Sequence, residues 1–351
     1  MGTRSLLLGS SLVAIAALFV LFPTYNSSPP AGKREVLKIV ADVPLPGPAA
    51  RFDYQSLDPS DGRLYIAHMN ADQLIVFDTK KREVLANLEG FHRVHGVIAV
   101  PELARIFASV TGDHRVAVVD RASLTTIAEV GEIKYPDGLA YASSVNRVFV
   151  SDEHGNSDAV IDPSTNTLVA TIPLGGGAGN TVYDRVGDRI LVAVHGKNDL
   201  VTIDPLRLNI IARTPLLWPE DPHGLALDVE DHLVFVAGQG NNKLVVVNLN
   251  SKQVGPPFTT GRDPDVLAFD EGMKRLYVAA ESGRVTVFQE GNRALEVLGD
   301  LHMPHAHSVA VDSKTHLVYF PLEDVDGKPL LRIMQPVEDD SPRVQPGKGG
   351  A

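Results

Sequence analysis

The sequence contains no cysteine, which excludes disulfide bonds, a lipid anchor on an N-terminal cysteine and thiol nucleophiles. Basic residues are outnumbered: 32 Lys and Arg stand against 43 Asp and Glu, and the formal net charge is −11 at pH 7. Nucleic-acid binders usually carry a basic stripe, so no nucleic acid is expected as a partner. After residue 30 no segment has apolar residues at a sustained helical period of 3.6, and we therefore expect an all-β protein.

Motifs of nucleophilic catalysis are also lacking. The chain has no G-x-S-x-G elbow and no H-E-x-x-H helix. Serine or cysteine chemistry is therefore disfavoured, and histidines and carboxylates remain as the candidate functional groups.

The first 30 residues have the composition of an export signal. An uncharged run of 18 residues, Ser5 to Phe22, follows Arg4 and leads into a Pro-, Ser- and Asn-containing stretch that ends at Pro30. The run is longer than a typical signal-peptide core of about 7–15 residues, and no clean A-x-A cleavage site follows it. We therefore expect residues 1–30 to be a signal peptide or a retained membrane anchor, which places the protein in the periplasm or outside the cell.

One short phrase recurs seven times along the chain, and each copy begins with a polar residue, here called the leader. The leaders are Asp53, His95, Asp137, Asn180, His223, Asp265 and His307. Successive leaders are 42 or 43 residues apart. Repeats of this length, each holding several short strands, are typical of propellers, in which one repeat forms one blade.

The third repeat shows four β-branched runs separated by turn residues. They are residues 139–141, 147–151, 159–162 and 168–172. The same pattern in every repeat predicts a single seven-bladed propeller with four-stranded blades over residues 34–335. The seventh repeat lacks one strand, and an unassigned run at residues 36–40 would supply it and close the ring. The polar tail, residues 336–351, is expected to be disordered.

Two phrases carry a resemblance to a known family. Residues 159–175, AVIDPSTNTLVATIPLG, and residues 222–228, PHGLALD, look like the YVTN-type repeat of YncE-like propellers. The resemblance covers about residues 35 to 335. It implies a propeller fold, and because related propellers include lactonases, lyases and binding proteins, it does not fix an activity.

The leaders define the candidate site. In an antiparallel blade the first strand starts where the second strand ends, so both positions lie on one face of the disc. We predict that His95, His223 and His307 are metal ligands, and that a small ligand is bound by Asp53, Asp137, Asn180 and Asp265 together with Glu153 and His195 from the loops after second strands. Neutral imidazoles and carboxylates are ligand types for divalent metals.

An alternative interpretation remains open, in which the leaders hydrogen-bond strand starts and line a water-filled channel. Two local features favour a site: three histidines between His302 and His307, and the Asp-Glu-His run at residues 152–154.

The sequence is compatible with three functions. The first is an exported YncE-like protein that binds a small ligand, an ion or a protein partner at the channel mouth. The second is a metal-dependent hydrolase of the lactonase kind, or a lyase, in which a divalent cation polarises a carbonyl and a histidine is the general base. The third is a propeller that only displays its loops to other proteins.

Overall fold

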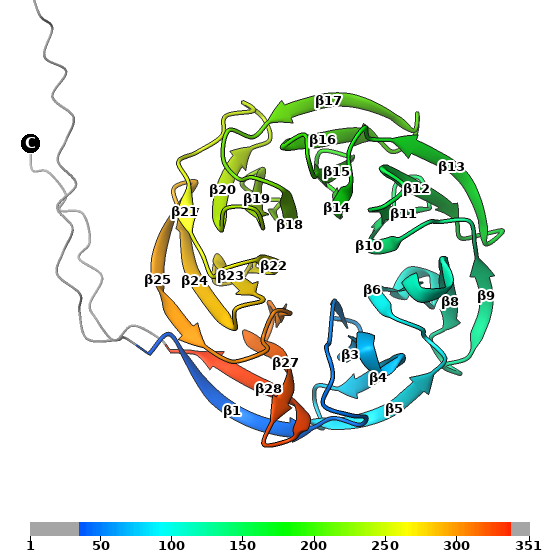
Figure 1. The fold of residues 1–351 in the computed structure, drawn as a ribbon, viewed down its shortest axis with the longest axis vertical. Helices are drawn as coiled ribbons and strands as arrows, with labels where there is room; N and C mark the ends of the chain where they lie inside the picture. The colour runs from blue at the N-terminus through cyan, green and yellow to red at the C-terminus, as the bar shows by residue number, and fades with distance from the viewer. Residues whose placement is uncertain (1–34, 338–351) are drawn as a thin grey trace, which may run out of the picture. The chain divides into compact units, whose positions relative to one another are not determined.

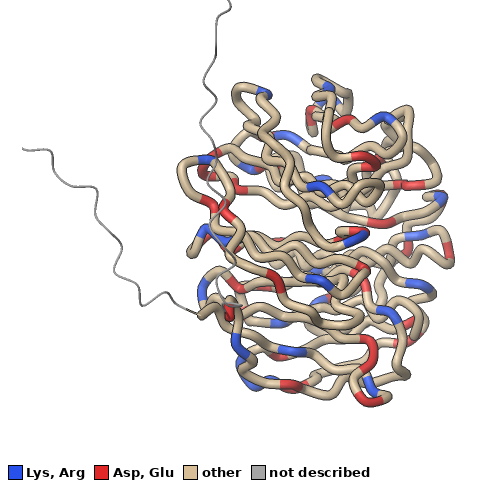
Figure 2. The backbone as a smooth tube through the Cα atoms, turned by 60° about the vertical axis from the view of Figure 1, so that its left-hand side comes forward, with Lys and Arg blue, Asp and Glu red and all other residues tan. Residues whose placement is uncertain are grey.

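The computed structural model describes residues 35–337, which form seven four-stranded antiparallel sheets arranged as a ring (Figure 1). The all-β, seven-bladed fold predicted from the repeat is confirmed. The predicted signal peptide or anchor and nearly all of the predicted tail lie outside the described residues. No described helix has the length and apolar character needed to cross a bilayer. On the side shown in Figure 2, Lys and Arg are interspersed with Asp and Glu.

The blades follow one another along the chain. Blade 1 contains β2 (Gln55–Asp58), β3 (Arg63–His68), β4 (Gln73–Asp78) and β5 (Glu83–Glu89); blade 2 contains β6 (Val94–Val100), β7 (Arg105–Val110), β8 (Arg115–Asp120) and β9 (Thr126–Val130). Blade 3 contains β10 (Pro136–Ala142), β11 (Arg147–Asp152), β12 (Ser157–Asp162) and β13 (Thr167–Pro173); blade 4 contains β14 (Ala178–Asp184), β15 (Arg189–Val194), β16 (Asp199–Asp204) and β17 (Asn209–Pro215). Blade 5 contains β18 (Pro222–Asp228), β19 (Leu233–Gly238), β20 (Lys243–Asn248) and β21 (Phe258–Thr259); blade 6 contains β22 (Pro264–Asp270), β23 (Arg275–Ala280), β24 (Arg284–Gly291) and β25 (Ala294–His302). Blade 7 contains β26 (Ala310–Asp312), β27 (Leu317–Val325), β28 (Lys328–Pro336) and β1 (Leu37–Pro44). The helical segments among residues 35–337 are three short 3-10 turns, η1 (Met69–Ala71), η2 (Pro101–Leu103) and η3 (Thr111–Asp113).

The two ends of the described chain close the ring. Strand β1 pairs with β28 in antiparallel register, from Leu37 opposite Pro336 to Pro44 opposite Leu330. A bidentate ion pair between Arg332 and Asp42 lies on this seam. The predicted closure is confirmed, although β1 extends four residues beyond the predicted run because its alternation continues to Pro44.

The turns between the third and fourth strands share one hydrogen-bond pattern in blades 3 and 4. Asp162 and Asp204 end third strands, and their carboxylates accept hydrogen bonds from backbone N–H groups two or three residues ahead. Residues Asn166 and Leu208 then take positive φ, each at 55°. The Asp at the strand end therefore fixes the turn, and the left-handed position accepts Leu208 as well as Asn166.

The core lies between neighbouring blades, where the second and third strands are almost completely buried. One apolar cluster joins Tyr65 and Val76 of blade 1 to Val97 and Ala108 of blade 2. Equivalent clusters follow around the ring, so every blade buries its faces against its neighbours.

A β-bulge marks the start of five inner strands. In β10 the register jumps between Pro136 and Leu139, so that two residues lie opposite one residue of β11. The same jump occurs in β6, β14, β18 and β22. In β6, β10, β18 and β22 the bulge contains the leader and the residue after it, whereas in β14 it contains Gly179 and the leader Asn180. A bulge changes the direction in which side chains point.

Glycine follows the leader where successive blades approach most closely. A Cβ at Gly96 would collide with the backbone carbonyl oxygen of Asp137, and a Cβ at Gly224 would collide with that of Asp265. At Gly138 the collision would be with the Asn180 amide. At these three positions glycine therefore allows one blade to pack closely against the leader of the next blade.

We expect Gly224→Ala to lower the free energy of unfolding by about 1–3 kcal/mol, because the new methyl group meets a backbone carbonyl that cannot move away. Gly131→Ala is the matched control, since a Cβ there has no neighbour within 4 Å. Urea unfolding monitored by circular dichroism measures both variants. Equal stability of the two variants would show that the close approach does not constrain residue 224.

Asp158 of β12 is a buried carboxylate outside the ring of leaders. One oxygen accepts a hydrogen bond from Thr181 at 3.0 Å, and the other has no partner. Burial raises the pKa of Asp158 to about 7. In the unfolded chain an Asp ionises near pH 4, so between about pH 4 and 7 the folded state binds the extra proton and stability falls as the pH rises.

Asp158→Asn removes this proton-linked cost. We expect the variant to gain stability relative to the wild type as the pH rises from 4 to 8, by roughly 2–4 kcal/mol in total. Thermal unfolding across this pH range measures the difference. Glu296→Gln, at an exposed carboxylate of β25, serves as the control and should follow the wild type at every pH.

Candidate functional site

The seven leaders gather at the mouth of the central channel. Six of them are buried and Asn180 is half-buried. Side chains from opposite sides of the ring touch there: the Tyr54 hydroxyl of blade 1 lies 3.3 Å from Nε2 of His223 in blade 5. Arg51 lies 3.5 Å from Asp265 of blade 6. The mouth is a compact polar cluster to which short polar contacts join five of the predicted ligand-binding residues, namely Asp53, Asp137, Asp265, Glu153 and His195. In the described part of the chain no side-chain hydrogen bond or ion pair joins the sixth, Asn180, to this cluster.

His223 is the hydrogen-bonding centre of this cluster. Its Nε2 lies 3.2 Å from Oδ1 of Asp265, and its Nδ1 lies 3.1 Å from Nε2 of His195. Burial opposes a charge on His223, but the hydrogen bond and the charge of Asp265 outweigh it and raise the pKa of His223 to about 9. Although burial disfavours its ionised form, the hydrogen bond from His223 lowers the pKa of Asp265 to about 2.

A protonated His223 and an ionised Asp265 determine which atoms donate and which accept in these hydrogen bonds. A protonated His223 donates from Nε2 to Asp265 and from Nδ1 to His195. His195 must then be neutral, which agrees with burial and the His223 charge lowering its pKa to about 4. Its Nδ1 carries the proton and faces the Glu153 carboxylate at 3.9 Å. Glu153 and His195, which were predicted to bind ligand from the loops after second strands, therefore both reach the cluster.

Asp53, Asp265 and His307 form the group with the spacing of a metal site. One ligand atom from each lies within 4.8 Å of the other two, and all three side chains are buried. Burial, reinforced by the charges of Asp265 and Asp137, raises the pKa of Asp53 well above its usual value. Two carboxylates this close repel each other when both are ionised, and a bound cation would remove that repulsion.

His307 supplies an unused nitrogen to the same group. Its Nε2 is fully buried and has no hydrogen-bond partner. Burial and the Arg51 charge lower the pKa of His307, which keeps the imidazole neutral. A neutral imidazole with one free nitrogen is the state that coordinates a metal.

His95 lies on the other side of Asp53. Its Nδ1 donates to the Arg93 carbonyl at 2.7 Å, and its Nε2 accepts from the Tyr135 hydroxyl at 3.1 Å. Burial lowers the pKa of His95 to about 4. Both nitrogens are thus occupied by the protein, and Nε2 is still 4.0 Å from Asp53.

The three histidines predicted as ligands therefore have different partners. His307 has a free nitrogen, whereas His95 and His223 use both nitrogens in hydrogen bonds. Within residues 35–337, no group that meets the metal-site spacing contains all three. Direct ligation by His95 and His223 stays a prediction.

Asp137 is buried beside His223 and is not fully satisfied. Its Oδ2 is 3.9 Å from Nε2 of His223, and its Oδ1 has no hydrogen-bond partner. Burial raises the pKa of Asp137 to about 7, against the opposing effect of the His223 charge. A carboxyl group of this kind exchanges a proton near neutral pH.

Three functional-site residues were missed by the sequence analysis: Arg51, Tyr54 and Tyr135. Arg51 pairs with Glu281 at 2.5 Å and with Asp265, so it neutralises part of the carboxylate charge. Tyr54 directly follows its leader, at the position where three other repeats have glycine. This large side chain in place of glycine was the sequence signal that residue 54 reaches across the channel. Tyr135 packs against His154, with ring centroids 4.0 Å apart and the ring planes tilted by 39°.

Other candidates lie outside the cluster or have structural roles. His68 is stacked on Phe52, with ring centroids 4.0 Å apart, and is completely buried. His302 is exposed, as expected for a surface residue. In the glycine-rich segment at residues 175–179, a Cβ at Gly176 would collide with the His195 carbonyl, so close packing against the site accounts for a glycine there.

A second carboxylate group lies at the opposite ends of the blades. Asp228, Asp231 and Glu290 meet the spacing of a cation site. The Lys274 ammonium, however, lies 2.9 Å from both Asp228 and Asp231. Lys274 thus neutralises these carboxylates in place of a metal ion, and the group is a structural ion-pair network.

Comparisons with known proteins agree with the propeller fold. No protein-family model matches the chain, and no curated protein matches it. A chain of the Kuenenia stuttgartiensis hydrazine synthase structure is similar at 14% identity with a TM-score of 0.68, and the match covers 89% of this chain and 98% of that one. A chain of a mitotic checkpoint complex is similar at 12% identity and TM-score 0.72, covering 93% and 100% of the two chains. Virginiamycin B lyase from Staphylococcus aureus is similar at 11% identity and TM-score 0.70, covering 85% and 99%. At these identities the likeness shows the seven-bladed fold alone.

Proposed function

We propose that this chain is an exported, YncE-like propeller that binds a divalent cation at its channel mouth and presents it to a small ligand. The observation that carries the proposal is the buried group of Asp53, Asp265 and His307, in which Nε2 of His307 has no hydrogen-bond partner. Buried polar atoms normally have partners, so an unpaired imidazole nitrogen beside two carboxylates suits a cation as the partner.

The donor set favours a transition metal. Calcium and magnesium prefer oxygen ligands, whereas an imidazole with two carboxylates suits Zn²⁺ or Mn²⁺. Three protein ligands leave coordination positions for solvent or a ligand. Arg51 beside Asp265 and the protonated His223 would hold the two carboxylates in place around the ion.

Export and family membership rest on the sequence. The apolar run at residues 5–22 supports passage out of the cytoplasm, and the phrase at residues 159–175 supports the YncE-like assignment. The small ligand or protein partner would meet the protein at the channel mouth, since the polar cluster lies there.

A second candidate function, a metal-dependent hydrolase or lyase, is favoured by Asp137. Its unpartnered oxygen and its pKa of about 7 would make it an acid or base next to the cation. A cation at the mouth would polarise a carbonyl, and Asp137 would move the proton.

We expect the protein, produced without residues 1–30 and without an affinity tag, to bind about one Mn²⁺ or Zn²⁺ per chain. His307→Ala and Asp53→Asn should each weaken binding at least tenfold, since each removes one ligand. Titration calorimetry after chelator treatment measures both metals separately. His302→Ala, an exposed histidine from the same His-rich stretch, is the matched control and should bind as the wild type does.

Circular dichroism must show that both variants stay folded. Asp53→Asn nearly preserves the size of the side chain and removes a charge that its neighbours oppose, so it serves as the second variant if the cavity left by His307→Ala unfolds the chain. Metal binding that survives both substitutions would contradict the proposed ligand set.

The enzyme candidate has a separate test. A screen of lactones and esters with the Mn²⁺-loaded protein should show turnover that Asp137→Asn reduces by about two orders of magnitude, while metal binding is retained. Metal binding without turnover would contradict the enzyme candidate and leave only the proposed binding function.

A further inference from the structure

Blade 5 departs from the repeat at its outer edge. Its outermost strand, β21, has two residues, whereas the outermost strand of every other blade has five to nine. The preceding residues are Gly255, Pro256 and Pro257, and prolines have no N–H to donate to a sheet. From residue 249 to 257 the chain keeps one isolated bridge, Val254 to Val247, and otherwise loops away from the sheet.

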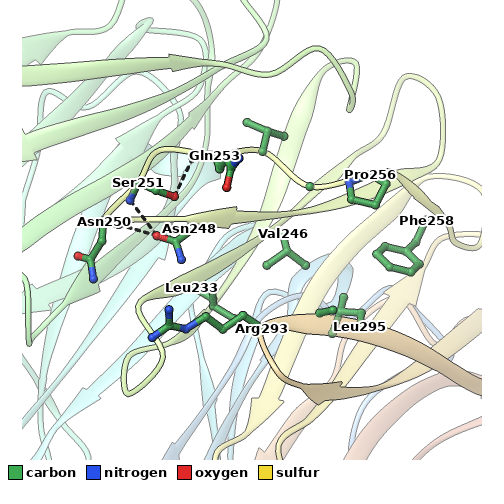
Figure 3. Close-up of a pocket in the computed structure, with 13 residues that line it drawn as sticks. Leu233, Val246, Asn248, Asn250, Ser251, Gln253, Pro256, Phe258, Arg293 and Leu295 are labelled. Carbon is green, nitrogen blue, oxygen red and sulfur yellow. Dashed lines mark hydrogen bonds between the residues drawn. The ribbon is translucent and has the colours of Figure 1, made fainter. Parts of the chain in front are cut away.

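This departure opens a cavity of about 680 Å³ between blades 5 and 6, here called the blade 5 cavity. Figure 3 shows the loop at residues 250–256 on one side and Arg293 and Leu295 on the other. The apolar part of the lining comes from Leu233, Val246, Phe258 and Leu295. The volume lies in the range of sites for small organic molecules, about 300–1,000 Å³.

The cavity lies away from the channel mouth. Val246 of β20 and Phe258 of β21 line it, but most of the lining comes from the turns between third and fourth strands and from the start of β19. In an antiparallel blade these positions lie at the end opposite the leaders. The proposed cation site and the blade 5 cavity are therefore independent of each other.

The polar part of the lining is neutral except for one cation. Asn248 accepts hydrogen bonds from the backbone N–H groups of Asn250 and Ser251, which fixes the loop (Figure 3). Arg293 is exposed, and its backbone N–H donates to the Glu290 carboxylate at 2.8 Å. Its guanidinium makes no ion pair within residues 35–337, and no carboxylate lines the cavity.

We propose that the blade 5 cavity binds a small amphiphilic carboxylate, with an apolar chain in the cavity and the carboxylate on Arg293. An apolar floor selects a hydrocarbon body, and an arginine without an ion-pair partner selects an anionic head because it can donate two parallel hydrogen bonds to a carboxylate. The neighbouring amides of Asn250 and Gln253 would supply further polar contacts.

The test uses dodecanoate below its micelle concentration as the probe. Trp218 is the only tryptophan of the chain, so Phe258→Trp in a Trp218→Phe background places one fluorophore in the cavity wall. We expect a saturable fluorescence change with one dodecanoate per chain. Arg293→Gln in the same background should weaken binding about tenfold, which is the effect of losing one charge-assisted contact.

Two controls distinguish the contribution of the dodecanoate carboxylate from that of its hydrocarbon tail. Dodecanol, which lacks the charge, should bind the parent and the Arg293→Gln variant equally weakly. Arg207→Gln removes an exposed arginine from the corresponding turn of blade 4 and should leave dodecanoate binding unchanged. Titration calorimetry of the otherwise unmodified chain checks that the reporter substitutions do not create the site.

Two outcomes would overturn the proposal. One is the absence of saturable dodecanoate binding in both fluorescence and calorimetry. The other is binding that Arg293→Gln does not weaken, or that dodecanol matches in the parent, because either result would remove the carboxylate contact with Arg293.

Discussion

The β-bulge at the start of the inner strands is the constraint on which the chemistry of the mouth depends. It places the leader and the following residue opposite a single residue of the second strand, as in the pairing of β10 with β11. Glycine at the second bulge position allows the next blade to approach, as the contact of Gly224 with Asp265 shows. Ring closure by β1 and β28 then brings residues more than 200 positions apart into contact, such as Arg51 and Asp265.

The mouth that results is a buried cluster of opposed charges. Three carboxylates, Asp53, Asp137 and Asp265, face one protonated histidine, His223, and one arginine, Arg51. Only Asp265 is fully compensated, because it accepts from His223 and lies beside Arg51. The pKa values of Asp53 and Asp137 stay raised, because the nearby positive charges of Arg51 and His223 do not outweigh the effect of burial on the two carboxylates. Such a cluster lowers the stability of the metal-free fold, and this is the cost expected of a site that binds a cation.

Most of the fold could be predicted from the sequence, because leaders 42 or 43 residues apart and four β-branched runs per repeat leave few alternatives. The convergence of the leaders followed from the topology. Their individual roles did not, because a role depends on which nitrogen of an imidazole is already used. His95 and His307 are equivalent in the repeat, yet the first has Tyr135 and the Arg93 carbonyl as partners and the second has a free Nε2. The blade 5 cavity was equally hidden, since it arises from an outer strand that the chain fails to form.

The most direct test of the account is a crystal structure of the protein soaked in Mn²⁺, with data collected to show the anomalous scattering of the metal. The account predicts a single strong anomalous peak at the channel mouth, within coordination distance of one carboxylate oxygen each of Asp53 and Asp265 and of Nε2 of His307. A mouth with no anomalous peak, in which a water or another side chain pairs with Nε2 of His307, would contradict it.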